Sequence, residues 1–186
     1  GRHLVDSQRL EVREIGLPDD PVLEGNLLKH RRRQSIDDGA LDLPPDQRAI
    51  YTQVLREVRA QVLGEVERVG VAKSQLHILA GLAKLRQAAC DPRLLGLPRE
   101  FSHDDSGKLS ALRELVEEVD SGGHKVLIFS QFVSMLKLVR EALDEDKIRY
   151  EYLDGSTIDR SECVDNFQND PTIPVFLISL KAGGSG

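Results

Sequence analysis

The run Lys125-Val126-Leu127-Ile128-Phe129-Ser130-Gln131-Phe132 leads from a lysine through apolar residues to a small polar residue. An apolar run without alternating polar positions is typical of a strand that is buried on both faces of a parallel sheet. The same pattern returns at residues 174–179 and, more weakly, at 149–153. The sequence therefore predicts three buried strands, and the rest of the chain is interpreted around them.

Helical patterns separate the three predicted strands. Apolar residues recur at helical spacing in residues 108–120, about 132–143 and about 158–168. The positions expected to face inward in the second and third of these helices are Phe132, Met135, Leu136, Val139 and Leu143, followed by Ile158, Val164 and Phe167. Strands that alternate with helices indicate an α/β fold with a parallel sheet and right-handed crossovers.

A pair of helices is predicted upstream of this α/β region. Prolines 44 and 45 precede a long helix that begins near Asp46, carries valines at steps of about four residues and ends at Gly70. A second helix is expected over residues 74–90, and it would form an antiparallel pair with the first. Its inward positions are expected to be Leu76, Leu79, Leu82, Ala83 and Ala89.

The N-terminal part of the chain is the least regular. Residues 10–15 alternate and could form a short strand, whereas the basic run 29–33 is either a solvated segment or a contact with nucleic acid or another lobe. We therefore predict three parts: an irregular linker or interlobe segment at 1–43, a helical annex at 44–105, and an α/β region at 106–186.

Composition and charge exclude several kinds of site and partner. The 186 residues have a net charge of −6 and contain two cysteines, with no metal-ligand spacing to any histidine. Residues 101–186 hold 9 Lys and Arg against 16 Asp and Glu, so any contact with phosphate there must be local. No apolar stretch is long enough for a membrane span, and we expect no membrane partner. Because residue 1 is glycine and Gly186 lies in a glycine-rich turn, we expect a piece of a longer protein.

Polar or glycine-bearing turns follow all three predicted strands. These are Ser130-Gln131, then Gly155-Ser156-Thr157, and then the stretch from Ser179 through Lys181 to Gly183, Gly184 and Gly186. Ligands of open parallel sheets bind at the carboxyl ends of the strands, where helix starts and glycine-rich backbone favour anions. Each turn could also be only a helix cap or a tight turn. Their convergence on one edge predicts an anion-binding site.

Catalytic motifs are missing from the sequence. It contains no HExxH motif, no G-x-S-x-G motif and no cysteine–histidine cluster. Ser106-Gly107-Lys108 lacks the rest of a phosphate-binding loop, and Asp104 and Asp105 stand where the backbone that surrounds the anion should be. We therefore expect no catalytic residue and no metal ligand in this chain.

Several of these segments resemble one known family. The segments Phe129-Ser130-Gln131-Phe132, Leu153-Asp154-Gly155-Ser156-Thr157 and Ser179-Leu180-Lys181-Ala182-Gly183-Gly184 are similar, in order and spacing, to the second motor lobe of Swi/Snf-type ATPases. These are superfamily-two, helicase-like DNA translocases, and the likeness covers about residues 43–186. The resemblance suggests either a bacterial member that recycles RNA polymerase or a member that is like the chromatin remodellers.

The resemblance implies a partial RecA-like lobe with flanking helices, preceded by the helical annex. It also implies that Ser130, Gln131, Gly155, Ser156, Ser179 and Lys181 lie toward a double-stranded DNA backbone, and that Gly183, Gly184 and Gly186 lie toward the nucleotide. ATP and Mg²⁺ are cofactors of the parent protein, and a first motor lobe is an expected partner. Because that lobe and the arginine-bearing sixth motif are not in this sequence, we expect the 186 residues alone to bind neither cofactor and to be inactive as an ATPase.

Two other functions stay open at this point. The chain could be a regulatory nucleotide-binding α/β domain without motor activity, or an interaction domain whose helices at 46–90 bind a partner protein. For the motor, the expected location is the cytoplasm of a bacterium, at the nucleoid, or the nucleus of a eukaryote.

Overall fold

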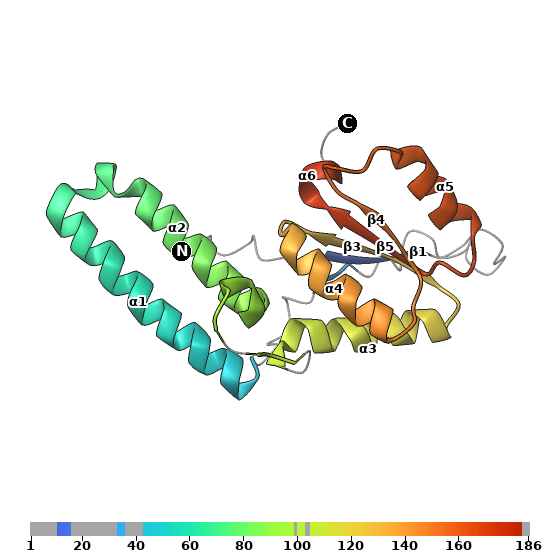
Figure 1. Cartoon of the computed structure of the whole chain (residues 1–186), viewed down its shortest axis with the longest axis horizontal. Coiled ribbons are helices and arrows are strands. Elements are labelled where there is room, and N and C mark those ends of the chain that lie inside the picture. The colour runs from blue at the N-terminus through green and yellow to red at the C-terminus, as the bar shows by residue number, and fades with distance from the viewer. Residues whose placement is uncertain (1–10, 16–32, 36–42, 99, 103–104, 184–186) are drawn as a thin grey trace. The chain divides into compact units, whose positions relative to one another are not determined.

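The computed structural model describes residues 11–15, 33–35, 43–98, 100–102 and 105–183 (Figure 1). The chain divides into two compact units. One unit comprises residues 1–40 and 111–186, and the other comprises residues 41–110. None of the described helices is both long enough and apolar enough to cross a membrane.

A five-stranded sheet forms the centre of the first unit, with the strand order β2-β1-β3-β5-β4. The strands are β1 (Glu11–Ile15), β2 (Arg33–Ser35), β3 (Lys125–Ser130), β4 (Tyr150–Leu153) and β5 (Val175–Ser179). Strand β5 lies between β3 and β4 and runs parallel to both. The predicted parallel arrangement of the three buried strands is thus confirmed, with boundaries that differ by one residue at most.

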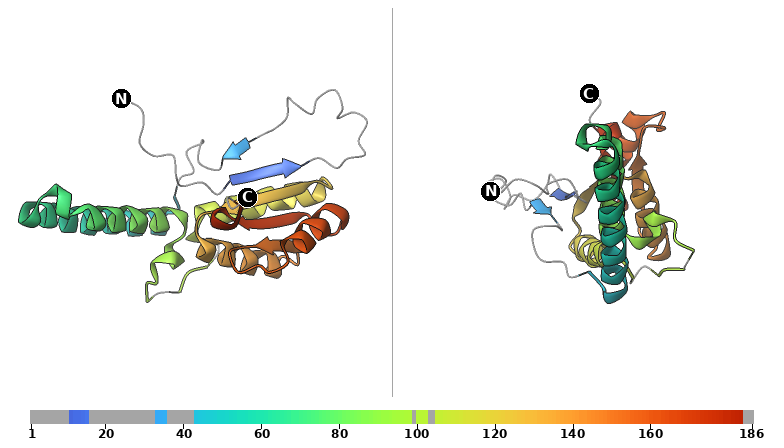
Figure 2. Two further views of the ribbon diagram at one scale, coloured as in Figure 1. Left: turned by 90° about the horizontal axis from the view of Figure 1, so that it is seen from above. Right: turned by 90° about the vertical axis from the view of Figure 1, so that its left-hand side faces the viewer.

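The N-terminal strands extend this sheet on the other side of β3. Strand β1 pairs antiparallel with β3, and β2 pairs antiparallel with β1 (Figure 2). Alternation in residues 10–15 predicted a strand but not its partner, because alternation carries no information on pairing. Residues 29–32 of the basic run lie outside the described residues.

Helices connect the parallel strands and cover the sheet. Helix α4 (Val133–Glu145) contacts β3 and β5, and helix α5 (Arg160–Asn169) contacts β4. The connection from β3 to β4 passes beyond β5, whereas the connection from β4 to β5 runs in the opposite direction across the sheet. Right-handed crossovers in opposite directions place α4 and α5 on opposite faces of the sheet.

The apolar core is formed by the strands and the inward faces of the helices. The buried residues here include Val126, Ile128, Val175 and Leu177 on the strands, and Met135, Leu136, Val139 and Leu143 on α4. A second group, comprising Leu153, Phe167, Ile173, Phe176 and Ala182, lies around α5, and its two phenylalanine rings are 5.2 Å apart. Helix α3 (Gly107–Ser121) buries Leu112, Val116 and Val119, as its spacing predicts.

Ile158 does not face inward, so its prediction as a core residue is wrong. Its side chain is 99% exposed. Helix α5 begins only at Arg160, after Asp159, whose side chain accepts a hydrogen bond from the backbone N–H of Glu162. Ile158 therefore precedes the helix and does not share the orientation of the helical face that contains Phe167.

Lys125 at the start of β3 is buried and caps the C-terminal end of α5. Its Nζ donates to the carbonyl oxygen of Asp170 at 2.9 Å and to that of Phe167, and it lies 5.0 Å from the centre of the Phe167 ring. Burial lowers the pKa of Lys125, and the negative charge of Asp170 acts in the opposite direction. The last carbonyl groups of a helix have no partner within the helix, and Lys125 satisfies them here.

The second unit contains an antiparallel helical hairpin (Figure 1). Helix α1 (Pro45–Val69) follows Pro44 and ends at Gly70, whose φ is +82°, and the short 3₁₀ helix η1 (Val71–Lys73) leads into α2 (Gln75–Cys90). Gly81 of α2 packs against Val58 of α1. A Cβ atom added there would lie 2.5 Å from Cγ1 of Val58, so only glycine fits without a shift.

The leucines of α2 do not pack against α1, contrary to the expectation from their spacing. Leu76, Leu79 and Leu82 are 78%, 62% and 46% exposed, and Ala83 is exposed as well. The buried residues of α2 are Gly81, Ala88 and Cys90. Small residues allow the two backbones to approach closely, and this approach turns the bulkier leucines away from α1.

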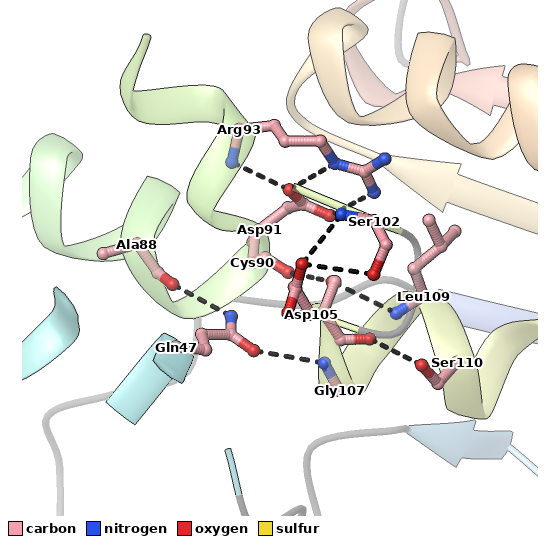
Figure 3. Close-up of polar contacts among 11 residues, drawn as sticks. Gln47, Ala88, Cys90, Asp91, Arg93, Ser102, Asp105, Gly107, Leu109 and Ser110 are labelled. Carbon is pink, nitrogen blue, oxygen red and sulfur yellow. Dashed lines mark hydrogen bonds and ion pairs between the residues drawn. The ribbon is translucent and has the colours of Figure 1, made fainter. Parts of the chain in front are cut away.

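A buried polar junction joins the ends of three helices in this unit (Figure 3). Gln47 of α1 is fully buried, and its Nε2 donates to the carbonyl of Ala88 at 3.0 Å. Its Oε1 accepts from the backbone N–H of Gly107, the first residue of α3, at 3.1 Å. One side chain therefore satisfies a carbonyl near the end of α2 and an amide at the start of α3.

Asp91 and Arg93 complete this junction. Asp91 is fully buried, and its two carboxylate oxygens accept from Nε and Nη2 of Arg93 at 2.9 and 2.8 Å. Asp91 also accepts from the backbone N–H of Arg93, which starts the 3₁₀ helix η2 (Pro92–Leu95). Ser106 donates its hydroxyl to the carbonyl of Cys90 at 3.2 Å.

Replacing Gln47 by methionine is expected to destabilise the chain by about 2–4 kcal/mol, because the carbonyl of Ala88 and the amide of Gly107 would then be buried without partners. Urea unfolding followed by far-ultraviolet circular dichroism measures the loss. Gln61→Met, at an exposed position of the same helix, is the matched control and should change stability by less than about 0.5 kcal/mol. Equal losses in the two variants would contradict the role given to the Gln47 amide.

Candidate nucleic-acid interface

The carboxyl ends of β3, β5 and β4 lie side by side because the three strands are parallel neighbours. Ser130 at the end of β3 is the register partner of Ser179 at the end of β5, and Leu153 at the end of β4 is the partner of Ile178. The turns that follow the strands therefore meet at one edge of the sheet, which we term the strand-end edge. It brings together Ser130-Gln131, Gly155-Ser156-Thr157 and Ser179.

Ser130 is buried, and its hydroxyl organises the turn into α4. Only 3% of Ser130 is exposed, and its Oγ accepts a hydrogen bond from the backbone N–H of Phe132 at 3.1 Å. The neighbouring Gln131 is half-buried and lies just before the helix start. Ser130 thus shapes the turn that presents Gln131.

Ser179 is fully buried at the end of the central strand. Among the described residues, its Oγ is a buried side-chain oxygen without a hydrogen-bond partner. An unsatisfied buried hydroxyl costs free energy, and such groups often mark positions where a partner is supplied by another molecule or by a change of conformation. The sequence alone gives no signal for this property, because it depends on what surrounds the side chain.

The turn after β4 is organised by Asp154. Its Oδ1 accepts from the backbone N–H and the hydroxyl of Ser156 at 2.8 and 2.6 Å, and its own N–H donates to Oγ1 of Thr157 at 2.9 Å. The hydrogen bonds from Ser156 hold the pKa of Asp154 below its ordinary value. Gly155 and Ser156 are exposed at the tip, and a Cβ atom added at Gly155 would meet no atom within 4 Å. The tip is therefore both ordered by Asp154 and sterically open.

Arg140 of α4 lies against two tyrosines of β4, and one of them, Tyr152, contacts Asp154. Cζ of Arg140 lies 4.7 Å from the ring centre of Tyr152 and 5.7 Å from that of Tyr150, and its Nε donates to the hydroxyl of Tyr150 at 3.2 Å. The hydroxyl of Tyr152 donates to Oδ2 of Asp154 at 2.8 Å. Burial, together with this hydrogen bond, raises the pKa of Tyr152 to about 12 from an ordinary value of 10.0.

The stretch after β5 was expected to be a glycine-rich turn, and this expectation is wrong for its first part. Residues Leu180–Gly183 form the short helix α6, because the chain enters helical geometry directly after Ser179. The residue Lys181 lies in α6, whereas Gly184 and Gly186 lie outside the described residues.

Two further residues organise the strand-end edge, and neither is among the predicted site residues. For Asp154 a local signal exists, because an aspartate two residues before a serine often caps its own turn. Arg160 donates from Nη1 to the carbonyl of Ala182 in α6 at 3.2 Å and so links the start of α5 to this edge. Its partner is 22 residues away, and no local pattern predicts the contact.

The chemistry available at the edge is hydrogen bonding. The groups that converge there are hydroxyls, an amide side chain, exposed backbone at a glycine, and the carboxylate of Asp154, which accepts hydrogen bonds from Ser156 and Tyr152. Within the described part of the chain, no cluster of three or more His, Cys, Asp or Glu side chains is arranged to hold a metal ion.

Comparison with known proteins identifies the second half of the chain. Residues 107–186 match the family described as "Helicase conserved C-terminal domain". Residues 107–186 form a helicase C-terminal domain that is similar to those of Swi/Snf-type ATPases.

The relatives agree on this assignment. Over 84 residues, the chain is 48% identical to the protein named "Chromatin-remodeling ATPase INO80" of Aspergillus oryzae, and the match covers 44% of this chain and 6% of that protein. The structure titled "Sulfolobus solfataricus SWI2/SNF2 ATPase C-terminal domain" is similar with a TM-score of 0.67 and 32% identity, over 77% of this chain and 62% of that one. The "Sulfolobus solfataricus SWI2/SNF2 ATPase core in complex with dsDNA" matches with a TM-score of 0.65 and 31% identity, over 74% of this chain and 29% of that one.

Tyr152 gives the turn at Asp154 a measurable signature in alkaline solution. The pKa of Tyr152 is raised in the folded state, so its protonated hydroxyl contributes fully to the free energy of unfolding below pH 10. This contribution is lost as the pH rises from about 10 toward 12. We expect Tyr152→Phe to lose less unfolding free energy between about pH 9 and pH 11 than the wild type does. Urea unfolding at the two pH values measures this, with Tyr51→Phe in α1 as the control. A Tyr152→Phe curve with the wild-type pH dependence would contradict the assignment.

Proposed function

We propose that this chain is part of an ATP-dependent motor that moves along double-stranded DNA, and that it supplies the second lobe of that motor. The observation that carries the proposal is the strand-end edge, where the turns after three adjacent parallel strands offer neutral hydrogen-bonding groups to an anion. Since the chain aligns with about 6% of the curated relative's length, the activity belongs to a longer polypeptide. The similar Sulfolobus core, which its title describes as bound to dsDNA, supports DNA as the ligand.

We assign the DNA-facing residues to two roles. Gly155, Ser156, Gln131 and Lys181 would approach the phosphate backbone, because the first two are exposed and the others follow strand ends. Ser130 and Ser179 are buried and would hold the turns in place behind them. Contacts of this kind position a protein on DNA without reading its sequence, as a translocase requires.

The nucleotide would lie toward Gly183, Gly184 and Gly186. Phosphoryl transfer requires a phosphate-loop lysine, a magnesium ion and an arginine, and the 186 residues contain no G-x-x-x-x-G-K-S/T motif. ATP and Mg²⁺ would therefore be bound chiefly by a first lobe, with this chain closing the cleft. The similarity to a chromatin-remodelling ATPase supports a nuclear location in a eukaryote, and in a bacterium the same motor would act at the nucleoid.

The 186-residue chain should bind double-stranded DNA weakly, with an affinity that falls steeply as salt is raised, because phosphate contacts release counterions. Fluorescence anisotropy with a labelled duplex at several salt concentrations measures this. Gly155→Asp should weaken binding by about two- to fivefold at low salt, since a carboxylate would then face the phosphates, whereas the neutral Gly155→Asn should not.

The control for that experiment is Gly64→Asp, at an exposed position of α1 where an added Cβ atom also meets nothing within 4 Å. Gly64→Asp should leave DNA binding unchanged. Equal effects of the aspartates at positions 155 and 64 would indicate a general charge effect and contradict the proposed interface.

The motor proposal itself is tested by ATP hydrolysis in a polypeptide that contains both lobes. Alanine at Ser130, Gln131 and Lys181 together should abolish most of the DNA-stimulated ATPase rate and leave the rate without DNA nearly unchanged. The 186-residue chain alone should hydrolyse no ATP. Full DNA stimulation in the triple variant would rule out this role for the strand-end edge.

A further inference from the structure

The hairpin of α1 and α2 carries an apolar surface that neither helix buries. Five leucines, each more than 40% exposed, lie on the two helices: Leu55 and Leu63 on α1, and Leu76, Leu79 and Leu82 on α2. Together they expose on the order of several hundred Å² of apolar surface, which is as large as the largest apolar patch of a typical monomeric protein. Surfaces of this size commonly bind another protein.

An open groove of about 380 Å³ lies between the two helices within this surface. Its walls include Leu55, Val62 and Leu63 from α1, and Ile78 and Leu82 from α2. From Leu82 the apolar surface continues at three-residue steps through Leu79 to Leu76, along one side of α2. The leucines span residues 55–63 of α1 and 76–82 of α2, so at a rise of about 1.5 Å per residue this surface is on the order of 10–15 Å long, which suits two to three turns of a helix lying along it.

Two arginines at the groove have no carboxylate partner among the described residues. Arg59 lines the groove and Arg56 lies one turn before Arg59, and both arginines are exposed and unpaired among the described residues. Two carboxylates of the hairpin are already engaged: Glu65 pairs with Arg68 at 2.7 Å, and Glu57 pairs with Lys84 at 3.5 Å. In total, α1 and α2 hold six Lys and Arg against four Asp and Glu.

We propose that this surface binds an acidic amphipathic helix of a partner protein. The helix would place its apolar stripe in the groove and its carboxylates beside Arg56 and Arg59. A second copy of the chain is disfavoured, because a two-fold interface would set the same face against itself and bring these arginines together. The inference concerns residues 45–90 alone and does not depend on the motor proposal.

The test uses the 186-residue chain and a synthetic peptide of about 20 residues, with leucines at helical spacing and glutamates on both sides of the leucine stripe. Fluorescence anisotropy should detect saturable binding of this peptide. A matched peptide with lysine in place of each glutamate should bind at least about tenfold more weakly, because its charges would face Arg56 and Arg59.

Substitutions in the hairpin test whether the peptide binds at this groove. Leu79→Ser and Leu82→Ser should each weaken binding of the acidic peptide by about tenfold, and both should fold because the two side chains are exposed. Arg59→Glu should weaken binding of the acidic peptide and strengthen binding of the basic one. Ile158→Ser, which removes an even more exposed apolar side chain from the other unit, is the control and should change neither affinity.

Three results would overturn the proposal. The first is the absence of saturable binding by the acidic peptide, and the second is equal binding of the two peptides. The third is a concentration-dependent dimer in analytical ultracentrifugation that Leu82→Ser abolishes, because the occupant would then be a second copy of the chain.

Discussion

The parallel hydrogen-bonded register of β3, β5 and β4 is the constraint on which the candidate site depends. It fixes Ser130 beside Ser179 and brings the turn after Leu153 to the same edge. A one-residue slip of β5 would reverse the faces of its side chains and exchange Phe176 with Val175 and Leu177 between two packed faces that each fit the present residues. The burial of these apolar residues therefore positions the polar turns, although none of the buried residues would touch a ligand.

Much of this arrangement could be predicted because the signals are local and strong. Each buried strand is a continuous apolar run with a polar end, and the helices between the strands show clear periodicity, so the α/β order follows from the chain itself. The convergence of the three turns then follows from topology, since parallel neighbours end at the same edge. The resemblance to the Swi/Snf-type lobe added the identity of the ligand, which periodicity does not provide.

The incorrect predictions concern properties that depend on tertiary surroundings. Leucines at helical spacing on α2 predicted a packed face, but Gly81 and Ala88 form that face, because a close approach of two backbones favours small residues over large ones. Ile158 follows an aspartate-organised turn and precedes the start of α5, so the periodic pattern did not apply to it. The pairing of β1 with β3, the buried hydroxyl of Ser179 and the contact of Arg160 with Ala182 all join distant parts of the sequence, and no local pattern encodes them.

The hydrogen atom at the α-carbon of Gly81 determines the spacing of the hairpin. Because a methyl group at this position would lie 2.5 Å from Cγ1 of Val58, the two helices can keep their present distance only while residue 81 has no side chain. The exposed leucines along the hairpin can therefore change in evolution without altering that distance, so that the hairpin can bind new partners while the spacing of its helices stays the same. Substitution at residue 81 would instead separate the helices and alter every recognition surface built on them at once.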